Sequence, residues 1–146
     1  MAVQTSYTAT HAAALEGMEG DTDASGTHNV SRTCEATVGY GKAVSQGAGD
    51  HGVVPFASAV TKFLGVTVRD QAVDPTSPNG FRQYDTAPVK RRGTIWVVVS
   101  APVAAGDPVY LTAAGAFTNI STSNTLVTGA RFDTTAASGA LALLRL

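Results

Sequence analysis

Hydrophobic residues are densest in residues 94–99, near the middle of the chain. This stretch, Thr-Ile-Trp-Val-Val-Val, is apolar at nearly every position and rich in β-branched side chains, which favours a β-strand over a helix. A strand that is apolar on both faces is expected to be covered on both sides, by a second layer of the same domain or by another protein. We therefore identify a candidate core and assembly strand, made of Ile95, Trp96, Val97, Val98 and Val99.

The chain from residue 30 onwards alternates short apolar stretches with glycine and proline. The clearest period-two alternation lies in residues 62–69, and the strongest loop signal lies in residues 74–80, which hold two prolines and an Asn-Gly pair. Further short strands are predicted at residues 30–38, 41–45, 51–56, 81–85, 109–111, 117–118, 125–133 and 141–146. Strands at intervals of about 8–12 residues are typical of sandwiches and barrels. The predicted fold is therefore all-β, with one jelly-roll-like sandwich or barrel domain over residues 30–146.

Residues 1–29 differ from the rest because few of them are suited to a hydrophobic core. Residues 12–18 favour a helical turn, but Gly17 and Gly20 would stop it early, and so short a helix needs tertiary support. Residues 19–29 are acidic and rich in turn formers. We therefore predict an extended N-terminal arm, residues 1–29, which becomes ordered only where another surface holds it.

The charge content narrows the function classes, because only 14% of the residues are Asp, Glu, Lys or Arg, against about 25% in ordinary soluble proteins. A net charge of -1 gives no electrostatic footprint for nucleic acid or an anionic membrane, so neither is expected as a partner. With 44% hydrophobic residues, so low a charge favours a protein that is part of an assembly, since interface cores are depleted in charge. A small β domain with an uncharged polar surface is the alternative interpretation.

The sequence carries no mark of an oxidising compartment. Its single cysteine, Cys34, permits no disulfide within one chain. The N-terminus lacks the basic and apolar regions of a signal peptide, and no stretch approaches the roughly 20 apolar residues of a membrane span. These patterns predict a soluble protein that is synthesised in a cytoplasm.

Residues that could carry out catalysis or bind a metal occur without a supporting pattern. His11, His28 and His51 lack the spacing of metal ligands, and no serine lies in a Gly-x-Ser-x-Gly arrangement. Residues 21–29 resemble the start of a calcium-binding loop, but Arg32 stands where the closing glutamate would be. The sequence therefore predicts neither an enzyme nor a bound cofactor or metal ion.

The only basic run is Lys90-Arg91-Arg92. It has two interpretations, a contact with an acidic patch on a partner and a solubilising charge at a strand end that discourages edge pairing. The second is the simpler one.

Seven short segments, taken in order, carry a resemblance to a known family. They are Gly41–Val44, Phe63–Val66, Val89–Val97, Val103–Tyr110, Gly115–Phe117, Gly129–Phe132 and Ala140–Arg145. Together they resemble the capsid cement, or head decoration, proteins of tailed bacteriophages. The similarity covers the chain from about Gly39 to the C-terminus, with weaker support from Ala13 to Met18.

The resemblance implies a β-rich structural protein, not an enzyme, that forms a homodimer or homotrimer on the outside of an icosahedral head. It would bind the major capsid protein and hold the seams between its subunits against the pressure of packaged DNA. Such a protein is synthesised in the bacterial cytoplasm and resides on the outer capsid surface of the virion. On this interpretation the N-terminal arm reaches a neighbouring subunit, with Leu15 and Met18 as its candidate capsid contacts.

Two other structural roles are alternatives, a β domain of a phage tail or baseplate and a host-surface binding module. A ligand-binding module is expected to show aromatic residues clustered in loops. In this chain most aromatic residues lie within or beside predicted strands, which favours a role in the core. An enzyme is the least favoured class.

Overall fold

The computed structural model describes residues 14–20, 26–58, 62–70 and 79–146, and within these ranges its regular structure consists of β-strands without an α-helix. The strands of the described residues are β1 (His28–Cys34), β2 (Val38–Gly39), β3 (Ala43–Gln46), β4 (Gly52–Pro55), β5 (Phe63–Thr67), β6 (Gly80–Phe81), β7 (Thr86–Arg92), β8 (Thr94–Val98), β9 (Pro108–Leu111), β10 (Phe117–Thr118), β11 (Thr125–Phe132) and β12 (Leu141–Arg145).

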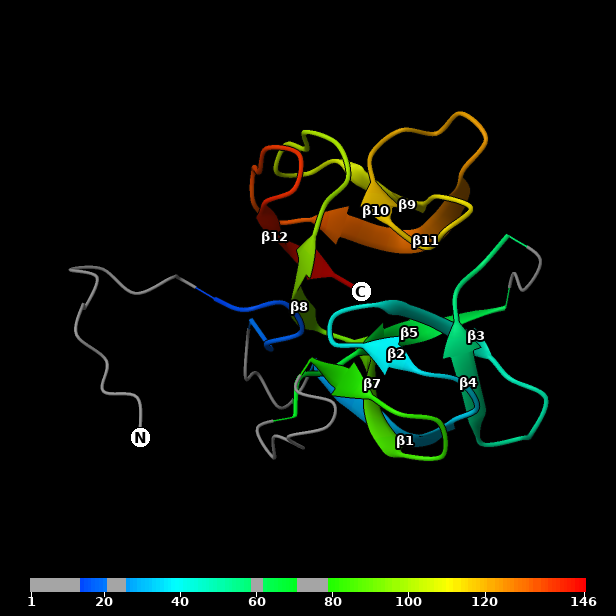
Figure 1. Cartoon of the computed structure of the whole chain (residues 1–146). Helices are drawn as coiled ribbons and strands as arrows, with labels where there is room; N and C mark the ends of the chain where they lie inside the picture. Colours follow the sequence, from blue (N-terminus) through cyan, green and yellow to red (C-terminus); the bar gives the residue numbers. More distant parts are fainter. Residues whose placement is uncertain (1–13, 21–25, 59–61, 71–78) are drawn as a thin grey trace, which may run out of the picture.

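These strands form a barrel and a sheet that lie one above the other in Figure 1. In the lower half, β1, β4, β3, β5 and β7 close into a barrel, in which β1 runs parallel to β4 and antiparallel to β7. In the upper half, a five-stranded sheet has the order β10-β9-β11-β12-β8. A two-stranded ribbon of β2 and β6 lies beside the barrel. The predicted all-β fold class is confirmed.

The barrel and the sheet are joined because β3 and β5 contribute side chains to both. Successive residues of a strand point to opposite faces, so Val44 lies in the core cluster of the barrel while its neighbour Ala43 lies in the cluster under the sheet. On β5, Leu64 packs against the barrel cluster and Val66 belongs to the sheet cluster. These two residues lie on opposite faces although they are two positions apart, because the pairing of β5 with β3 shifts register at Leu64. Barrel strands with two apolar faces thus hold the two halves together.

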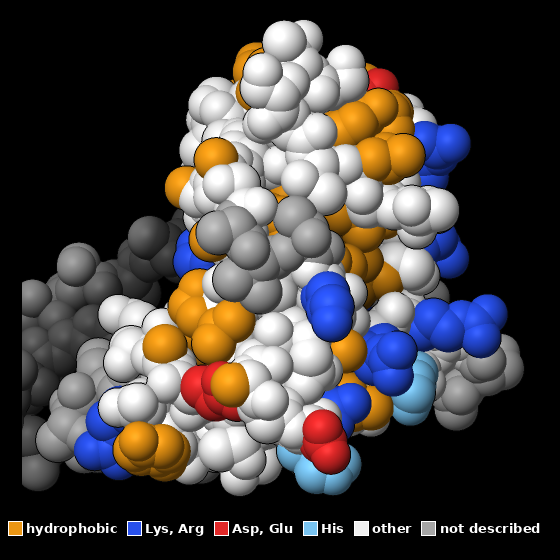
Figure 2. Space-filling view, turned by 90° about the vertical axis from the view of Figure 1, so that its right-hand side faces the viewer, with side chains coloured by type: hydrophobic (Ala, Val, Ile, Leu, Met, Phe, Trp, Pro, Cys, Tyr) orange, Lys and Arg blue, Asp and Glu red, His pale blue; other side chains and the backbone are white. Residues whose placement is uncertain are grey.

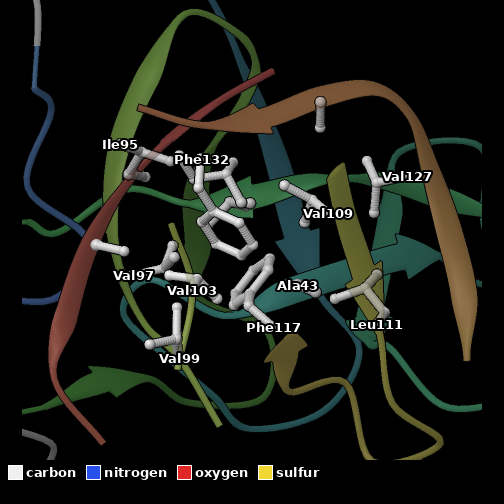
Figure 3. Close-up of a cluster of buried hydrophobic side chains, with 14 of the residues drawn as sticks. Ala43, Ile95, Val97, Val99, Val103, Val109, Leu111, Phe117, Val127 and Phe132 are labelled. Atoms are coloured by element: carbon white, nitrogen blue, oxygen red, sulfur yellow. The ribbon is translucent and has the colours of Figure 1, made fainter. Parts of the chain in front are cut away.

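The larger core lies between the sheet and the upper side of the barrel. Figure 3 shows the rings of Phe117 and Phe132 at its centre, with valines of β8 and β9 around them. Phe132, Val109 and Leu111 are all 0% exposed. Each large side chain buried in this way stabilises the fold by about 1.5–3 kcal/mol relative to its exposed state.

The two edge strands of the sheet, β10 and β8, approach each other just after the end of β8. Val99, which follows β8, forms a parallel bridge with Phe117 of β10, and the backbone N–H of Ser100 donates to the carbonyl of Phe117 at 2.9 Å. This part of the β8 edge is therefore paired within the chain.

Candidate functional site

The candidate assembly strand is β8, and its two faces differ in burial. Ile95, Val97 and Val99 are 0% exposed and belong to the larger core. Trp96 and Val98 point to the opposite face and are only half-buried. One apolar face of the strand therefore serves the core of the domain, and the second stays partly accessible to solvent.

The edge of β8 that does not pair with β12 is covered by the described part of the N-terminal arm, residues 14–20. The backbone N–H of Trp96 donates to the carbonyl of Met18 at 2.9 Å, and the N–H of Gly17 donates to the carbonyl of Trp96 at 2.8 Å. Glu19 and Ile95 form an antiparallel bridge. Residues 14–18 form a turn, not a helix, and this short strand-like pairing follows it; residues 12 and 13 lie outside the described residues.

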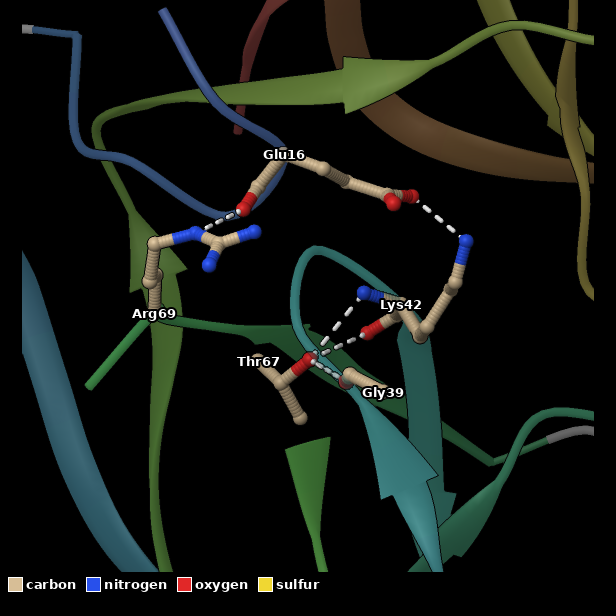
Figure 4. A network of polar contacts seen from close by, with 5 residues as sticks. All are labelled: Glu16, Gly39, Lys42, Thr67 and Arg69. Atoms are coloured by element: carbon tan, nitrogen blue, oxygen red, sulfur yellow. Dashed lines mark hydrogen bonds and ion pairs between the residues drawn. The ribbon is translucent and has the colours of Figure 1, made fainter. Parts of the chain in front are cut away.

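Polar contacts hold the same segment against the barrel (Figure 4). The Lys42 ammonium group pairs with the Glu16 carboxylate at 2.5 Å, and Nε of Arg69 donates to the backbone carbonyl of Glu16 at 2.9 Å. Thr67, which is 0% exposed, supports this corner because its hydroxyl donates to the carbonyl of Gly39 at 2.7 Å and accepts from the N–H of Lys42 at 3.0 Å. The segment therefore bridges the barrel and the sheet.

Lys90 on β7 makes the most buried polar contact with the arm. Its side chain is 0% exposed, and its Nζ lies 2.8 Å from Oε1 of Glu19. Nδ2 of Asn29 donates to the same oxygen at 2.6 Å. The hydrogen bond from Asn29 and the contact with Lys90 lower the pKa of the Glu19 carboxyl below its ordinary value. Within the basic run, Lys90 is thus buried, whereas Arg91 and Arg92 are exposed.

The half-buried face of β8 continues onto β12 as an apolar ladder, which the exposed Arg145 borders at one end. Trp96 pairs with Leu143, and Val98 pairs with Leu141, and all four side chains are half-buried. Because Glu19 lies opposite Ile95, the alternation of side chains places Met18 on the face of Trp96. We call these five residues, Met18, Trp96, Val98, Leu141 and Leu143, the outer ladder.

The arm residues that were predicted to contact a partner are accessible. Leu15 is 52% exposed and Met18 is 39% exposed. The structure brings Met18 beside the predicted assembly strand, which the sequence pattern had not indicated. The signal that could have indicated it is Gly20, where a Cβ would meet the side chains of Leu143 and Thr94.

The structure describes two of the three histidines and the single cysteine that the sequence analysis singled out. His28 and His51 are exposed on the barrel, and no group of three metal-ligating side chains occurs among the described residues. His11 and the calcium-like stretch 21–25 lie outside them. Cys34 is fully buried, and its burial together with the nearby charge of Asp85 raises the pKa of its thiol to about 11. Burial and a raised pKa both lower the reactivity of a thiol.

The described residues contain no helix with the length and apolar character that a membrane-spanning helix needs.

Solved structures with a similar fold come from phage heads. One chain of "The capsid of Myoviridae Phage XM1" is 19% identical, with a TM-score of 0.78 over 99% of this chain and 97% of that chain. A second, "The crystal structure of head fiber gp8.5 N base in bacteriophage phi29", is 12% identical, with a TM-score of 0.50 over 82% of this chain and 93% of that chain. At these identities the likeness concerns the fold. A comparison with curated proteins finds no match.

The sequence also matches a family model described as "Structural cement protein (E217 gp24/Pam3 gp6)", and the match runs over residues 3–146. It spans both the barrel and the sheet, together with the arm segment that joins them. The protein therefore belongs to the family of structural cement proteins of phages.

Proposed function

We propose that this capsid cement protein binds the outer surface of an icosahedral phage head as a homo-oligomer. Its partners are the major capsid protein and further copies of this chain, without direct contact with nucleic acid or membrane. It stabilises contacts between major capsid protein subunits, and it has no catalytic step. The family match supports the capsid role, and the outer ladder is the single observation that supports the oligomer.

The outer ladder fits an interface between copies of the chain. It carries no charged side chain, and its Trp and Leu residues are half-buried. Homo-oligomer interfaces are more apolar than other protein surfaces, and tryptophan is enriched among the residues that dominate binding energy. A symmetric contact would place the ladder of one copy against the same ladder of the next.

The arm is part of the proposal. We divide the chain into an arm of residues 1–29 and a β domain of residues 30–146, and we assign the contact with a neighbouring subunit to the arm. Leu15 and Met18 are exposed on its described segment. Residues 14–20 are already paired with β8 of the same chain. We therefore assign the contact with a neighbouring subunit to residues 1–13.

Cementing follows from repetition. When one copy contacts two shell subunits, these subunits can separate only if the copy also releases one of them. Once one contact has formed, the next is intramolecular and acts at a high effective concentration. Weak contacts repeated over a symmetric shell therefore add up to a large stabilisation.

The central experiment mixes the purified protein with undecorated heads of its phage. We expect the protein to sediment with the heads and to raise the temperature at which DNA escapes. Bovine serum albumin at the same concentration controls for nonspecific sedimentation. A folded protein that stays in the supernatant at saturating concentration would contradict the capsid role.

The oligomer is tested with the outer ladder variant Leu143→Asp and the matched control Ile120→Asp. Ile120 is 51% exposed in a loop outside the ladder, so the same chemical change there leaves the ladder intact. Light scattering should show that the wild-type protein has a mass that is a multiple of 14.9 kDa. Leu143→Asp should have the mass of a monomer, and Ile120→Asp should have the wild-type mass. A monomeric wild-type protein, or an oligomeric Leu143→Asp protein, would refute the interface.

The arm is tested by deleting residues 2–13, which leaves the paired segment 14–20 in place. We expect weaker retention on heads with an unchanged melting temperature of the free protein. A longer deletion of residues 2–28 serves as a comparison, since it also removes Glu19 and leaves the buried Lys90 without its partner. Unchanged head occupancy after the short deletion would show that residues 2–13 reach no neighbour.

A further inference from the structure

An open groove separates the sheet from the barrel on the side opposite the arm. It has a volume of about 420 Å³. Figure 2 looks at this side and shows hydrophobic side chains between the upper and lower parts of the molecule, with Lys and Arg side chains around them. The groove is lined by Lys62, Phe63, Leu64, Arg91, Leu126, Val127, Thr128, Ala130 and Leu146.

The groove lies beside the part of β11 that does not pair with β12. β12 pairs with β11 only at residues 131 and 132, where Arg131 faces Arg145 and Phe132 faces Leu144. β12 is the strand Leu141–Arg145, so residues 126–130 of β11 lie outside this pairing. On that side they have no strand partner among the described residues. Four residues of this part of β11, Leu126, Val127, Thr128 and Ala130, line the groove.

The lining combines apolar side chains with two cations. Leu126 is 50% exposed, a large exposure for a leucine, and Phe63 and Leu64 are only partly buried. Lys62 and Arg91 are exposed beside them. Among the residues that the structure describes, neither cation forms an ion pair with Asp or Glu, in contrast to Lys42 and Lys90.

We propose that this groove receives an extended segment of a capsid subunit that carries an apolar side chain next to an Asp or Glu. The segment lies beside residues 126–130 of β11, its apolar side chain covers Leu126 and Phe63, and its carboxylate pairs with Lys62 and Arg91. This inference rests on the proposed capsid role and names the chemistry of the contact. It distinguishes the groove, which binds the shell, from the outer ladder, which binds a second copy.

Charge distinguishes the proposed occupant from the chain's own arm. Residues 1–13 contain no Asp or Glu, so an arm supplied by a second copy would bring no carboxylate to Lys62 and Arg91 through this segment. A buried, unpaired cation is costly, and covering these two cations by an uncharged segment would therefore be unfavourable. A carboxylate-bearing partner removes that cost and adds electrostatic complementarity.

The test is charge reversal with a matched control, measured as binding to undecorated heads. The variant Lys62→Glu/Arg91→Glu reverses both cations of the groove. The control Arg92→Glu makes the same change at the next residue of β7, which is exposed but does not line the groove. We expect the double variant to bind heads at least about tenfold more weakly, and the control to bind within about threefold of wild type. Thermal melting confirms that each variant is folded.

The outcomes separate the two proposals. If wild-type protein binds heads and the folded double variant binds equally well, the groove is not the capsid contact. If wild-type protein fails to bind heads, the proposed capsid role fails, and this inference fails with it. Raising the salt concentration should weaken wild-type binding more than binding of the double variant, because the reversed groove has lost its attractive ion pairs.

A cross-linking experiment identifies the occupant. Thr128 lines the groove and is exposed, so Thr128→Cys accepts a benzophenone maleimide there. The native Cys34 is buried and does not compete for the label. Irradiation on heads should link the probe to a capsid-subunit peptide that contains Asp or Glu, whereas a probe at Ile120→Cys should give a different product. Links from residue 128 only to a second copy of this chain would overturn the assignment.

Discussion

Nζ of Lys90, a side chain without exposed surface, lies 2.8 Å from Oε1 of Glu19 in the N-terminal arm. This contact ties a barrel strand to a segment that also pairs with the edge of the upper sheet. A buried ammonium group is tolerated only where an opposite charge compensates for its lost hydration. Docking of the arm and burial of Lys90 are therefore mutually dependent.

The first prediction concerns this pair. Glu19→Gln leaves the buried Lys90 uncompensated and should lower the free energy of unfolding by about 1–3 kcal/mol. This loss is smaller than that expected for a fully buried ion pair, because Glu19 is partly exposed. Urea unfolding measures the change. The double variant Glu19→Gln/Lys90→Met should recover most of the loss, since it removes the charge as well as its partner. Equal stability of wild type and Glu19→Gln would show that the pair does not hold the arm.

The second prediction is loss of stability in acid. Hydrogen bonds lower the pKa values of three carboxyl groups. Glu19 accepts from Asn29, and Glu35 accepts from the backbone of Gly49 and Ala48. Asp107 accepts from the backbone of Ala104 and from the side chain of Asn119. A carboxyl with a lowered pKa contributes stability that is fully present above its unfolded-state pKa and is lost as the pH falls through its folded-state pKa.

Unfolding measured from pH 7 to pH 3 should therefore show that the free energy of unfolding decreases once the pH falls below the ordinary pKa range of carboxyl groups. Glu19→Gln should show a shallower decline than wild type. A decline of the same steepness in both proteins would assign the acid sensitivity to the other carboxyl groups.

The third prediction concerns Gly41, which approaches Gly17 backbone to backbone. Gly41 has φ +65°, and a Cβ there would lie 2.6 Å from the backbone N of Gly17. Gly41→Ala therefore combines left-handed strain, about 1–2 kcal/mol, with displacement of the arm. Gly106→Ala is the control, because Gly106 has φ +93° but no atom within 4 Å of its Cβ position. Chemical unfolding should show a larger loss for Gly41→Ala; equal losses would mean that the arm shifts without cost.

The fourth prediction separates the two faces of β8. Ile95→Ala removes a fully buried side chain and should cost about 2–5 kcal/mol in the free energy of unfolding. Trp96→Ala should cost less than the roughly 3–5 kcal/mol of a fully buried tryptophan, because its ring is only half-buried. Its larger effect should be on assembly, measured by light scattering. If Trp96→Ala lowered the free energy of unfolding as much as expected for a fully buried ring and left assembly unchanged, Trp96 would serve the core alone.

The apolar pattern predicted β8 well, because a run of β-branched residues suits a strand whatever lies around it. The same pattern did not predict β7, Thr86–Arg92, which contains Pro88 and three consecutive basic residues. Here the tertiary structure overrides composition: β7 closes the barrel against β1 and β5, and Glu19 compensates for the charge of Lys90. Local composition cannot signal a buried lysine whose partner lies far away in the chain.

The sequence by itself determined the all-β class, the central strand and the scarcity of charge that favours an assembly, because strand propensity and alternation are local properties. Only the tertiary structure decided that β8 has one core face and one accessible face. It also decided that residues 14–20 pair with the edge of β8, and that a groove lies beside the part of β11 that does not pair with β12. These features depend on which strands become neighbours and in what register, and register is set by the packing of the whole chain.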